Sequence, residues 1–178
     1  ESNCKDMNIK ILDEVFDLDY QTYLYLFCKE APYTIGWADS NDIEQQNRPF
    51  FHSNGDIDSL FLNDLDLKIR NTDFKEELEG YDLIDNAINC SRPGETYWTH
   101  THGKTIKVVL YYPNFKWNIE WGGETMFYDA KGKDLIFASE YKSNRMILFD
   151  GNIPHSVRAP TYIADQYRFT ISFFYHLK

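Results

Sequence analysis

From Leu83 onward, short strand-like runs follow one another, and turn signals such as Arg92-Pro93-Gly94 and Asp150-Gly151-Asn152 separate them. This succession constrains the fold more than any other feature, because about eight short strands without helices between them are typical of a jelly roll or sandwich. The predicted strands are Leu83–Cys90, Thr96–His102, Lys107–Tyr112, Glu124–Tyr128, Leu135–Ala138, Arg145–Phe149, His155–Arg158 and Tyr167–Tyr175.

The residues before Leu83 have a different pattern, which favours helices. Val15–Ala31 carries aromatic and aliphatic residues at three- and four-residue spacing and ends at Pro32. Two more helices are predicted at Asp56–Leu65 and Thr72–Glu79, with a strand at Tyr33–Ala38 and a loop at Ser40–Arg48. Helices gathered before the strands predict an α+β fold in which helices support one sheet. We expect a single domain over residues 1–178, with 1–82 mostly helical support and 83–176 the jelly-roll core.

The charge and the cysteines narrow the functional classes. A formal net charge of −10 argues against nucleic acid as a partner, because phosphate binding depends on Lys and Arg. The three cysteines are not closely spaced, so neither a disulfide framework nor a cysteine-based zinc site is expected. No apolar run approaches the length of a membrane span, and no signal peptide is recognisable. These features together predict a soluble, cytoplasmic protein without a membrane partner.

Three histidines form the main candidate for a functional site. His100 and His102 are two residues apart, and in a strand residues i and i+2 point to the same face. A neighbouring antiparallel strand can add His155 as a third ligand. Three ligands on one face of a metal leave open positions for a co-substrate and oxygen. Arg168 begins a later strand-like run, which suits the binding of a keto acid co-substrate.

Several segments carry a resemblance to a known family. The stretch from Leu83 to Phe174 resembles the prolyl 4-hydroxylase-like branch of the Fe(II)/2-oxoglutarate-dependent dioxygenases, which have a double-stranded β-helix fold. The segments that match in order are Pro93–His100, Leu110–Trp117, Trp121–Phe127, Phe149–His155 and Arg168–Phe174.

The resemblance assigns roles to individual residues. It implies that His100 and His155 bind iron and that Arg168 holds the distal carboxylate of 2-oxoglutarate as a two-pronged, charge-assisted pair. Tyr112 would donate its hydroxyl to the same carboxylate, and Ser172 would assist. The remaining implied residues are Val157 and Leu110 along the co-substrate slot, and Tyr97, Phe174 and Trp98 toward the substrate.

His102 departs from the family pattern, because it stands where the family has an aspartate ligand. Starting the motif at His102 instead would put Lys104, a cation unfit to bind a metal, in the ligand position. We therefore expect a three-histidine site. Two alternatives stay open: His102 faces away and leaves two ligands, or Glu124 supplies a carboxylate.

The resemblance implies a dioxygenase that uses Fe(II), 2-oxoglutarate and O2, with ascorbate as a possible addition, to hydroxylate a C–H bond. The best candidate for the substrate is a prolyl residue of a peptide or protein, and a small molecule stays open as an alternative substrate. The alternative is a three-histidine metal-binding jelly roll that does not use 2-oxoglutarate, either another dioxygenase or a non-enzymatic binding module. Arg168 and Tyr112 favour the first interpretation, because the alternative has no need of an inward arginine opposite the metal.

Overall fold

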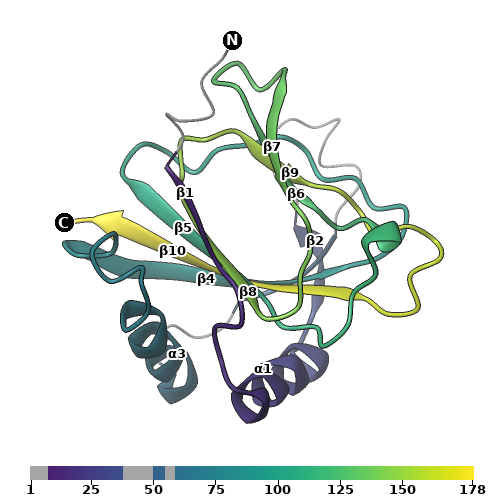
Figure 1. The fold of residues 1–178 in the computed structure, drawn as a ribbon, viewed down its shortest axis with the longest axis horizontal. Helices are drawn as coiled ribbons and strands as arrows, with labels where there is room; N and C mark the ends of the chain where they lie inside the picture. Colours follow the sequence, from purple (N-terminus) through teal and green to yellow (C-terminus); the bar gives the residue numbers. More distant parts are fainter. Residues whose placement is uncertain (1–7, 38–49, 55–58) are drawn as a thin grey trace.

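The computed structural model describes residues 8–37, 50–54 and 59–178, and within them two antiparallel sheets face each other (Figure 1). The larger sheet has the strand order β1 (Ile9–Leu12), β8 (Arg145–Asp150), β5 (Ile106–Tyr112), β10 (Arg168–Leu177), β4 (Tyr81–Ser91), β3 (Phe50–Ser53) and β2 (Thr34–Trp37). The smaller sheet has the order β7 (Leu135–Ser139), β6 (Thr125–Tyr128) and β9 (His155–Val157). The predicted α+β fold with a double-stranded β-helix core is confirmed.

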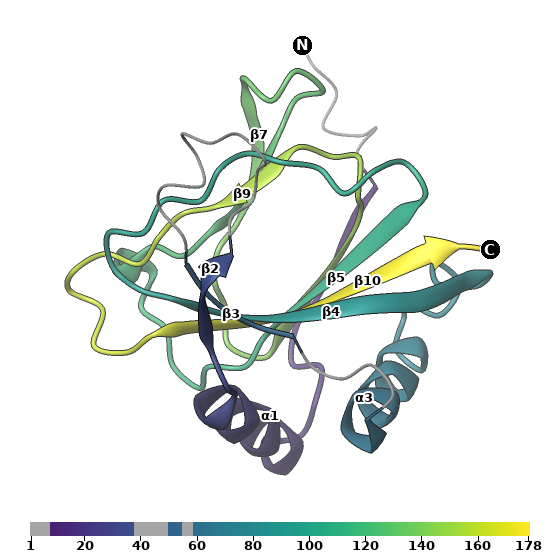
Figure 2. The ribbon, with the colours of Figure 1, turned by 180° about the vertical axis from the view of Figure 1, so that it is seen from behind.

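Helices α1 (Leu18–Glu30) and α3 (Leu60–Arg70) lie on the outer face of the larger sheet, away from the smaller one (Figures 1 and 2). Each begins at a side chain that caps its first turn. The Asp17 carboxylate accepts a hydrogen bond from Tyr20 N at 2.8 Å, and the Ser59 hydroxyl accepts one from Leu62 N at 3.2 Å. The helices and the sheet bury a shared apolar core, so this face is fully occupied by packing.

Strand alternation decides which side chains can form a site. In β10, the odd-numbered residues Phe169, Ile171, Phe173 and Tyr175 pack into the core beneath the helices. The even-numbered residues Arg168, Thr170, Ser172 and Phe174 line a cavity between the sheets. The same alternation holds in β5, where Val109 and Tyr111 face the helices while Val108 and Leu110 line the cavity. One strand therefore serves stability on one face and function on the other.

Two sequence predictions of regular structure are wrong. Thr96–His102 is not a strand: the chain there is irregular, and His100 forms one isolated bridge with His155. Thr72–Glu79 is a series of turns rather than a helix, although Phe74 and Leu78 are buried at helix-like spacing. Two apolar residues four apart satisfy the helical pattern, but the segment is only about two turns long, a length at which a helix is marginal, and Gly80 with φ +79° follows it.

The N-terminal region contains more strand than expected. β1 was not predicted, and it pairs antiparallel with β8, with Ile9 opposite Phe149. The predicted helix at Asp56–Leu65 corresponds to α3, which ends later, at Arg70; the segment 56–58 lies outside the described residues, as does the loop predicted at Ser40–Arg48. Among the described helices, none has the length and apolar character needed to cross a membrane.

Candidate active site

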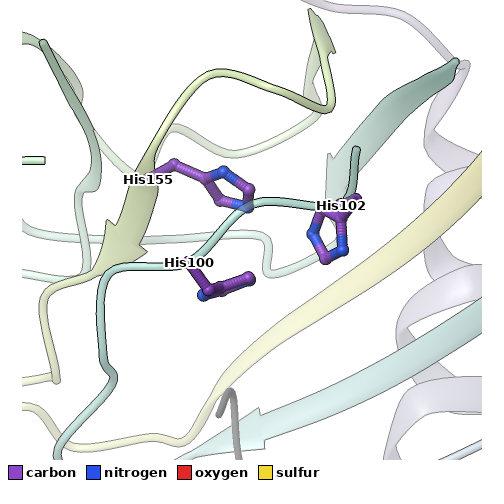
Figure 3. Close-up of side chains that lie close together, drawn as sticks. All are labelled: His100, His102 and His155. Carbon is purple, nitrogen blue, oxygen red and sulfur yellow. The ribbon is translucent and has the colours of Figure 1, made fainter. Parts of the chain in front are cut away.

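The rings of His100, His102 and His155 point toward one another between the two sheets (Figure 3). One potential ligand atom from each histidine lies within 4.8 Å of the others, and the ring centroids are 4.4–5.0 Å apart. His155 belongs to β9, whereas the other two stand on the irregular segment between β4 and β5. The predicted cluster of three histidines is therefore present, but two of them are not positioned by a strand.

Backbone hydrogen bonds hold the irregular segment in place. His100 N and O pair with His155 O and N at 3.0 and 3.1 Å, which fixes the first histidine beside the third. His102 N donates to Gly151 O at 2.6 Å. A substituent on Gly151 has little room, because a Cβ there would lie 2.9 Å from Ile106 O. Two separate anchors thus replace strand pairing in placing His100 and His102.

The tautomers of two of the histidines suit metal binding. His100 Nδ1 lies 2.9 Å from Trp98 O, and His155 Nδ1 lies 2.8 Å from Ile153 O. A carbonyl oxygen can only accept, so in both rings Nδ1 carries the proton and Nε2 carries the lone pair. A carbonyl partner on the distal nitrogen is the usual way in which proteins orient a metal-binding imidazole.

Burial keeps two of the histidines neutral. Desolvation, followed by the neighbouring His100, lowers the pKa of His102 to about 3. Desolvation, His100 and His102 together lower the pKa of His155 well below its usual value. A neutral imidazole is the metal-binding form, so no proton needs to be displaced from either ring at neutral pH.

Arg168 is the second notable group in the cavity, because its side chain is only 1% exposed. Its Nε donates to Gly123 O at 2.8 Å, and its two terminal nitrogens contact Thr170 Oγ1 and Thr125 Oγ1. Its guanidinium lies over the rings of Tyr112 and Tyr141, at 5.2 and 4.7 Å from their centroids. The structure records no ion pair between Arg168 and a carboxylate of the described residues, and none of the residues that line the cavity is acidic.

The cavity brings together most of the residues expected at the site. Leu110, Val157 and Ser172, expected around the co-substrate, line it together with Arg168, and Tyr97 and Phe174, expected near the substrate, line it as well. Phe174 is in edge contact with His102, with ring centroids 4.8 Å apart. The Tyr97 hydroxyl donates to Glu95 Oε2, and burial, then Glu95, raises the pKa of Tyr97 above its usual value.

Two expected residues do not line the cavity. Tyr112 is fully buried and stacks on Tyr141, and its hydroxyl contacts Thr125 Oγ1 at 2.5 Å rather than lining the cavity. Trp98 is absent from the cavity lining; its contribution is the carbonyl that accepts from His100. The direct roles expected for these two side chains stay predictions.

Thr125 and Gly123 are functional candidates that the sequence did not reveal. Thr125 Oγ1 lies between the Tyr112 hydroxyl and the guanidinium of Arg168. Gly123 has φ +86°, and a Cβ there would lie 3.1 Å from Arg168 Cδ and 3.2 Å from Trp117 Cζ2. Asn89 and Thr170, cross-strand neighbours on β4 and β10, also line the cavity. Alternation counted from Arg168 indicates Thr170, whereas nothing in the local sequence indicates Thr125.

Both carboxylates that could have replaced His102 as a ligand lie elsewhere. Glu124 is paired with Arg158, with Oε1 and Nη1 3.3 Å apart, and Glu124 is not part of the histidine cluster. Asp129 Oδ1 accepts hydrogen bonds from Lys133 N and Asp134 N and so closes a turn. Within the described residues, the group of His, Cys, Asp and Glu able to hold a metal consists of the three histidines.

These residues fit a divalent metal with a dianion beside it. Three neutral imidazoles suit iron and the other first-row metals that prefer nitrogen ligands. A buried guanidinium without a carboxylate partner is costly, because an uncompensated charge in the interior loses its hydration. A carboxylate of a bound ligand would supply the missing counter-charge, and its two oxygens match the fork of the guanidinium.

Comparison with known families shows to which class of protein the chain belongs. The family model of the 2OG-Fe(II) oxygenase superfamily matches residues 85–176, which is just over half of the chain. The chain belongs to the 2OG-Fe(II) oxygenase superfamily. Fe(II) and 2-oxoglutarate are the cofactors of that family, as its name states. The match spans all three histidines and Arg168. A search of curated proteins finds no match.

Solved structures share the fold at low sequence identity. A prolyl 4-hydroxylase of Pseudomonas putida has a TM-score of 0.71 at 14% identity, covering 97% of this chain and 94% of that one. HygX of Streptomyces hygroscopicus, with nickel and 2-oxoglutarate bound, has a TM-score of 0.69 at 10% identity, covering 96% and 83%. A prolyl hydroxylase of Trichoplax adhaerens, in complex with a peptide fragment of hypoxia inducible factor, has a TM-score of 0.59 at 17% identity, covering 97% and 84%.

Proposed function

We propose that this 2OG-Fe(II) oxygenase hydroxylates an unactivated C–H bond, with His100, His102 and His155 as the metal ligands and Arg168 as the anchor of 2-oxoglutarate. The observation that carries the proposal is the pairing of three converging imidazoles with a buried arginine in one cavity that no carboxylate of the described residues lines. Iron, when bound, supplies the activation of O2 that oxidises both 2-oxoglutarate and the substrate.

The chain's own residues bind and orient the reactants. Arg168 is held by Gly123 O, Thr125 and Thr170, so its fork has a fixed direction before 2-oxoglutarate binds. Thr125 and Tyr112 place hydroxyl groups beside that fork. Leu110 and Val157 cover the sides of the slot with apolar surface, which excludes water and strengthens the charge-assisted pair.

The absence of an aspartate ligand has an electrostatic consequence. With three neutral histidines, a divalent ion and the 2-oxoglutarate dianion form a neutral set, whereas an aspartate would add one negative charge. A metal alone in this cavity is not compensated by any lining carboxylate, and Arg168 adds a further positive charge. We therefore expect the metal and 2-oxoglutarate to stabilise each other's binding more than they would beside an aspartate.

For the substrate, a prolyl residue of a peptide or protein is our best candidate. Its support is the sequence resemblance to prolyl 4-hydroxylases and the shared fold of two solved prolyl hydroxylases. Small molecules are the second candidate, because HygX, which was also solved with hygromycin B bound, shares the same fold.

The test is conversion of 2-oxoglutarate to succinate by the purified protein supplied with Fe(II), O2 and a set of proline-containing peptides. We expect succinate to form only with iron and to increase with a true substrate. The His155→Ala protein should form none, and Arg158→Ala, which removes an arginine outside the cavity, should match the parent. A folded, iron-loaded parent that forms no succinate would favour the alternative of a metal-binding jelly roll that does not use 2-oxoglutarate.

A further inference from the structure

A second cavity adjoins the one that holds Arg168. It is lined by His52, Asn54, Ile84, Asp85, Ala87, His102, Ile106 and Phe174. Ala87, His102 and Phe174 line both cavities, so the two adjoin at these three residues. A molecule in the second cavity would therefore contact a residue of the proposed metal site, which is where a substrate must lie.

The two cavities carry opposite charges at their far ends. Arg168 and Ser91 are opposite each other in the pairing of β10 with β4, and Phe174 and Asp85 are opposite each other at the other end. The two ends are six positions apart along β10, so Asp85 lies about 20 Å from Arg168 at the usual strand rise. His102 lies where the two cavities adjoin.

The carboxylate of Asp85 is accessible and without an ionic partner. Its Oδ1 accepts a hydrogen bond from Asn86 N at 2.8 Å, and its side chain is exposed. The structure records no ion pair for Asp85 among the described residues, and neither lysine nor arginine lines this second cavity. Asp82, on the same strand, differs in this respect: it pairs with Lys178 at 3.1 Å and lines neither cavity.

The rest of the second cavity determines the shape of the ligand. Ile84, Ile106 and Phe174 provide apolar walls between Asp85 and His102. His52 and Asn54 provide a polar edge, and both ring nitrogens of His52 lie in contact with amide oxygens of Asn89 and Asn54. Such a lining matches an aliphatic stem that ends in a cation, because the stem covers apolar surface while the head stays near water and a carboxylate.

We propose that the substrate, a prolyl peptide or a small molecule, also carries an ammonium or guanidinium group on an aliphatic stem, and that Asp85 binds this group and determines specificity. This inference rests on the proposed function, since it takes the second cavity as the substrate site of the oxygenase. The two charges direct the two reactants to different cavities. The 2-oxoglutarate dianion is attracted to Arg168 and repelled by Asp85, whereas a cationic substrate is attracted to Asp85 and repelled by Arg168.

Matched ligands test the inference by direct binding. The probes are N-acetyl-lysine amide, N-acetyl-norleucine amide, which has nearly the same stem without the charge, and a blocked peptide with a central lysine. Affinities for the protein supplied with Zn²⁺ and 2-oxoglutarate are measured from NMR shift titrations at low salt. We expect the lysine amide to bind about fivefold more tightly than the norleucine amide, the scale of a favourable exposed ion pair. This preference should weaken as salt is added.

Two variants make the result decisive. Asp85→Asn should abolish the lysine preference, and Asp82→Asn, with the same change of charge on the same strand, should retain it. Equal affinity of the lysine and norleucine amides for the parent would overturn the proposal, as would a preference that persists in Asp85→Asn. Tighter binding of the blocked peptide than of the lysine amide indicates a peptide as the source of the cation, and the reverse order indicates a small molecule.

The binding measurement also separates this inference from the proposed function. An Asp85-dependent lysine preference in a protein that forms no succinate would support the cation site and contradict the oxygenase assignment. Succinate formation without any lysine preference would support the oxygenase and contradict the cation site.

Discussion

Under the proposed function, co-substrate binding depends most on Arg168. Arg168→Ala removes a buried cation that has no carboxylate partner of its own, and breaking such a pair with a ligand costs about 3–5 kcal/mol. We predict that 2-oxoglutarate affinity, measured by calorimetry, falls at least about a hundredfold, since each 1.4 kcal/mol is a factor of ten. Metal binding should persist. Arg158→Ala is the matched control. Equal 2-oxoglutarate affinity in the two variants would contradict the role of Arg168 in binding 2-oxoglutarate.

Gly123 provides a second test at the residue scale. Its φ of +86° and the 3.1 Å approach to Arg168 Cδ mean that Gly123→Ala strains the backbone and displaces the arginine. Gly80→Ala shares the positive φ, +79°, but has nothing within 4 Å of the added carbon. Both variants should lose about 1 kcal/mol or more of the free energy of unfolding. Weaker 2-oxoglutarate binding is expected only for Gly123→Ala, and the same loss of affinity in both would show that contact with Arg168 is irrelevant.

At the scale of elements, β10 separates stability from function by residue parity. Phe173 is fully buried in the core beneath the helices, so Phe173→Ala should lower the free energy of unfolding by about 3–5 kcal/mol. Ser172 faces the cavity, and Ser172→Ala should change that free energy by less than about 1 kcal/mol. Urea denaturation of the Phe173→Ala and Ser172→Ala proteins measures the two changes in the free energy of unfolding. Similar losses in both would mean that the cavity face is also a packing face.

Some strands of the fold could be predicted from the sequence and others could not. The strands on either side of the cavity were predictable because alternation runs through Arg168–Phe174 and because turn residues mark their ends. The segment before β5 was not, since the spacing of His100 and His102 imitates a strand, whereas the chain is held by two hydrogen bonds to His155 and one to Gly151. β1 was missed because its pairing with β8 is a long-range contact, which no local pattern marks.

The residues of the site likewise divide into those that could be predicted from the sequence and those that could not. The three histidines, Arg168 and the residues two and four positions beyond Arg168 follow from motif and alternation, and the structure brings them into one cavity. Thr125 and Gly123 were not identified, because their contacts with Arg168 join β6 and the residues before it to β10, more than forty residues away. Such contacts depend on how the two sheets pack, which local sequence does not encode.

For the molecule as a whole, charge balance in the cavity predicts that metal and co-substrate bind cooperatively. Among the residues that the structure describes, no carboxylate lines the cavity, so Mn²⁺ alone would lie among imidazole rings near the Arg168 cation. Saturating 2-oxoglutarate should raise Mn²⁺ affinity at least tenfold, and linkage requires Mn²⁺ to raise 2-oxoglutarate affinity by the same factor. His102→Asp adds a negative charge beside the metal, so the coupling factor, measured by equilibrium dialysis, should be smaller. A larger factor in His102→Asp would contradict the electrostatic account.

The central claim is that three histidines hold the metal while Arg168 holds the co-substrate. The most direct measurement is a crystal structure of the protein with Mn²⁺ and 2-oxoglutarate. We predict that nitrogen atoms of His100, His102 and His155 lie about 2.0–2.2 Å from the ion, the range for nitrogen ligands of this kind. We also predict that the distal carboxylate of 2-oxoglutarate pairs with both terminal nitrogens of Arg168. An ion coordinated by His100 and His155 without His102, or a 2-oxoglutarate carboxylate bound away from Arg168, would contradict the account.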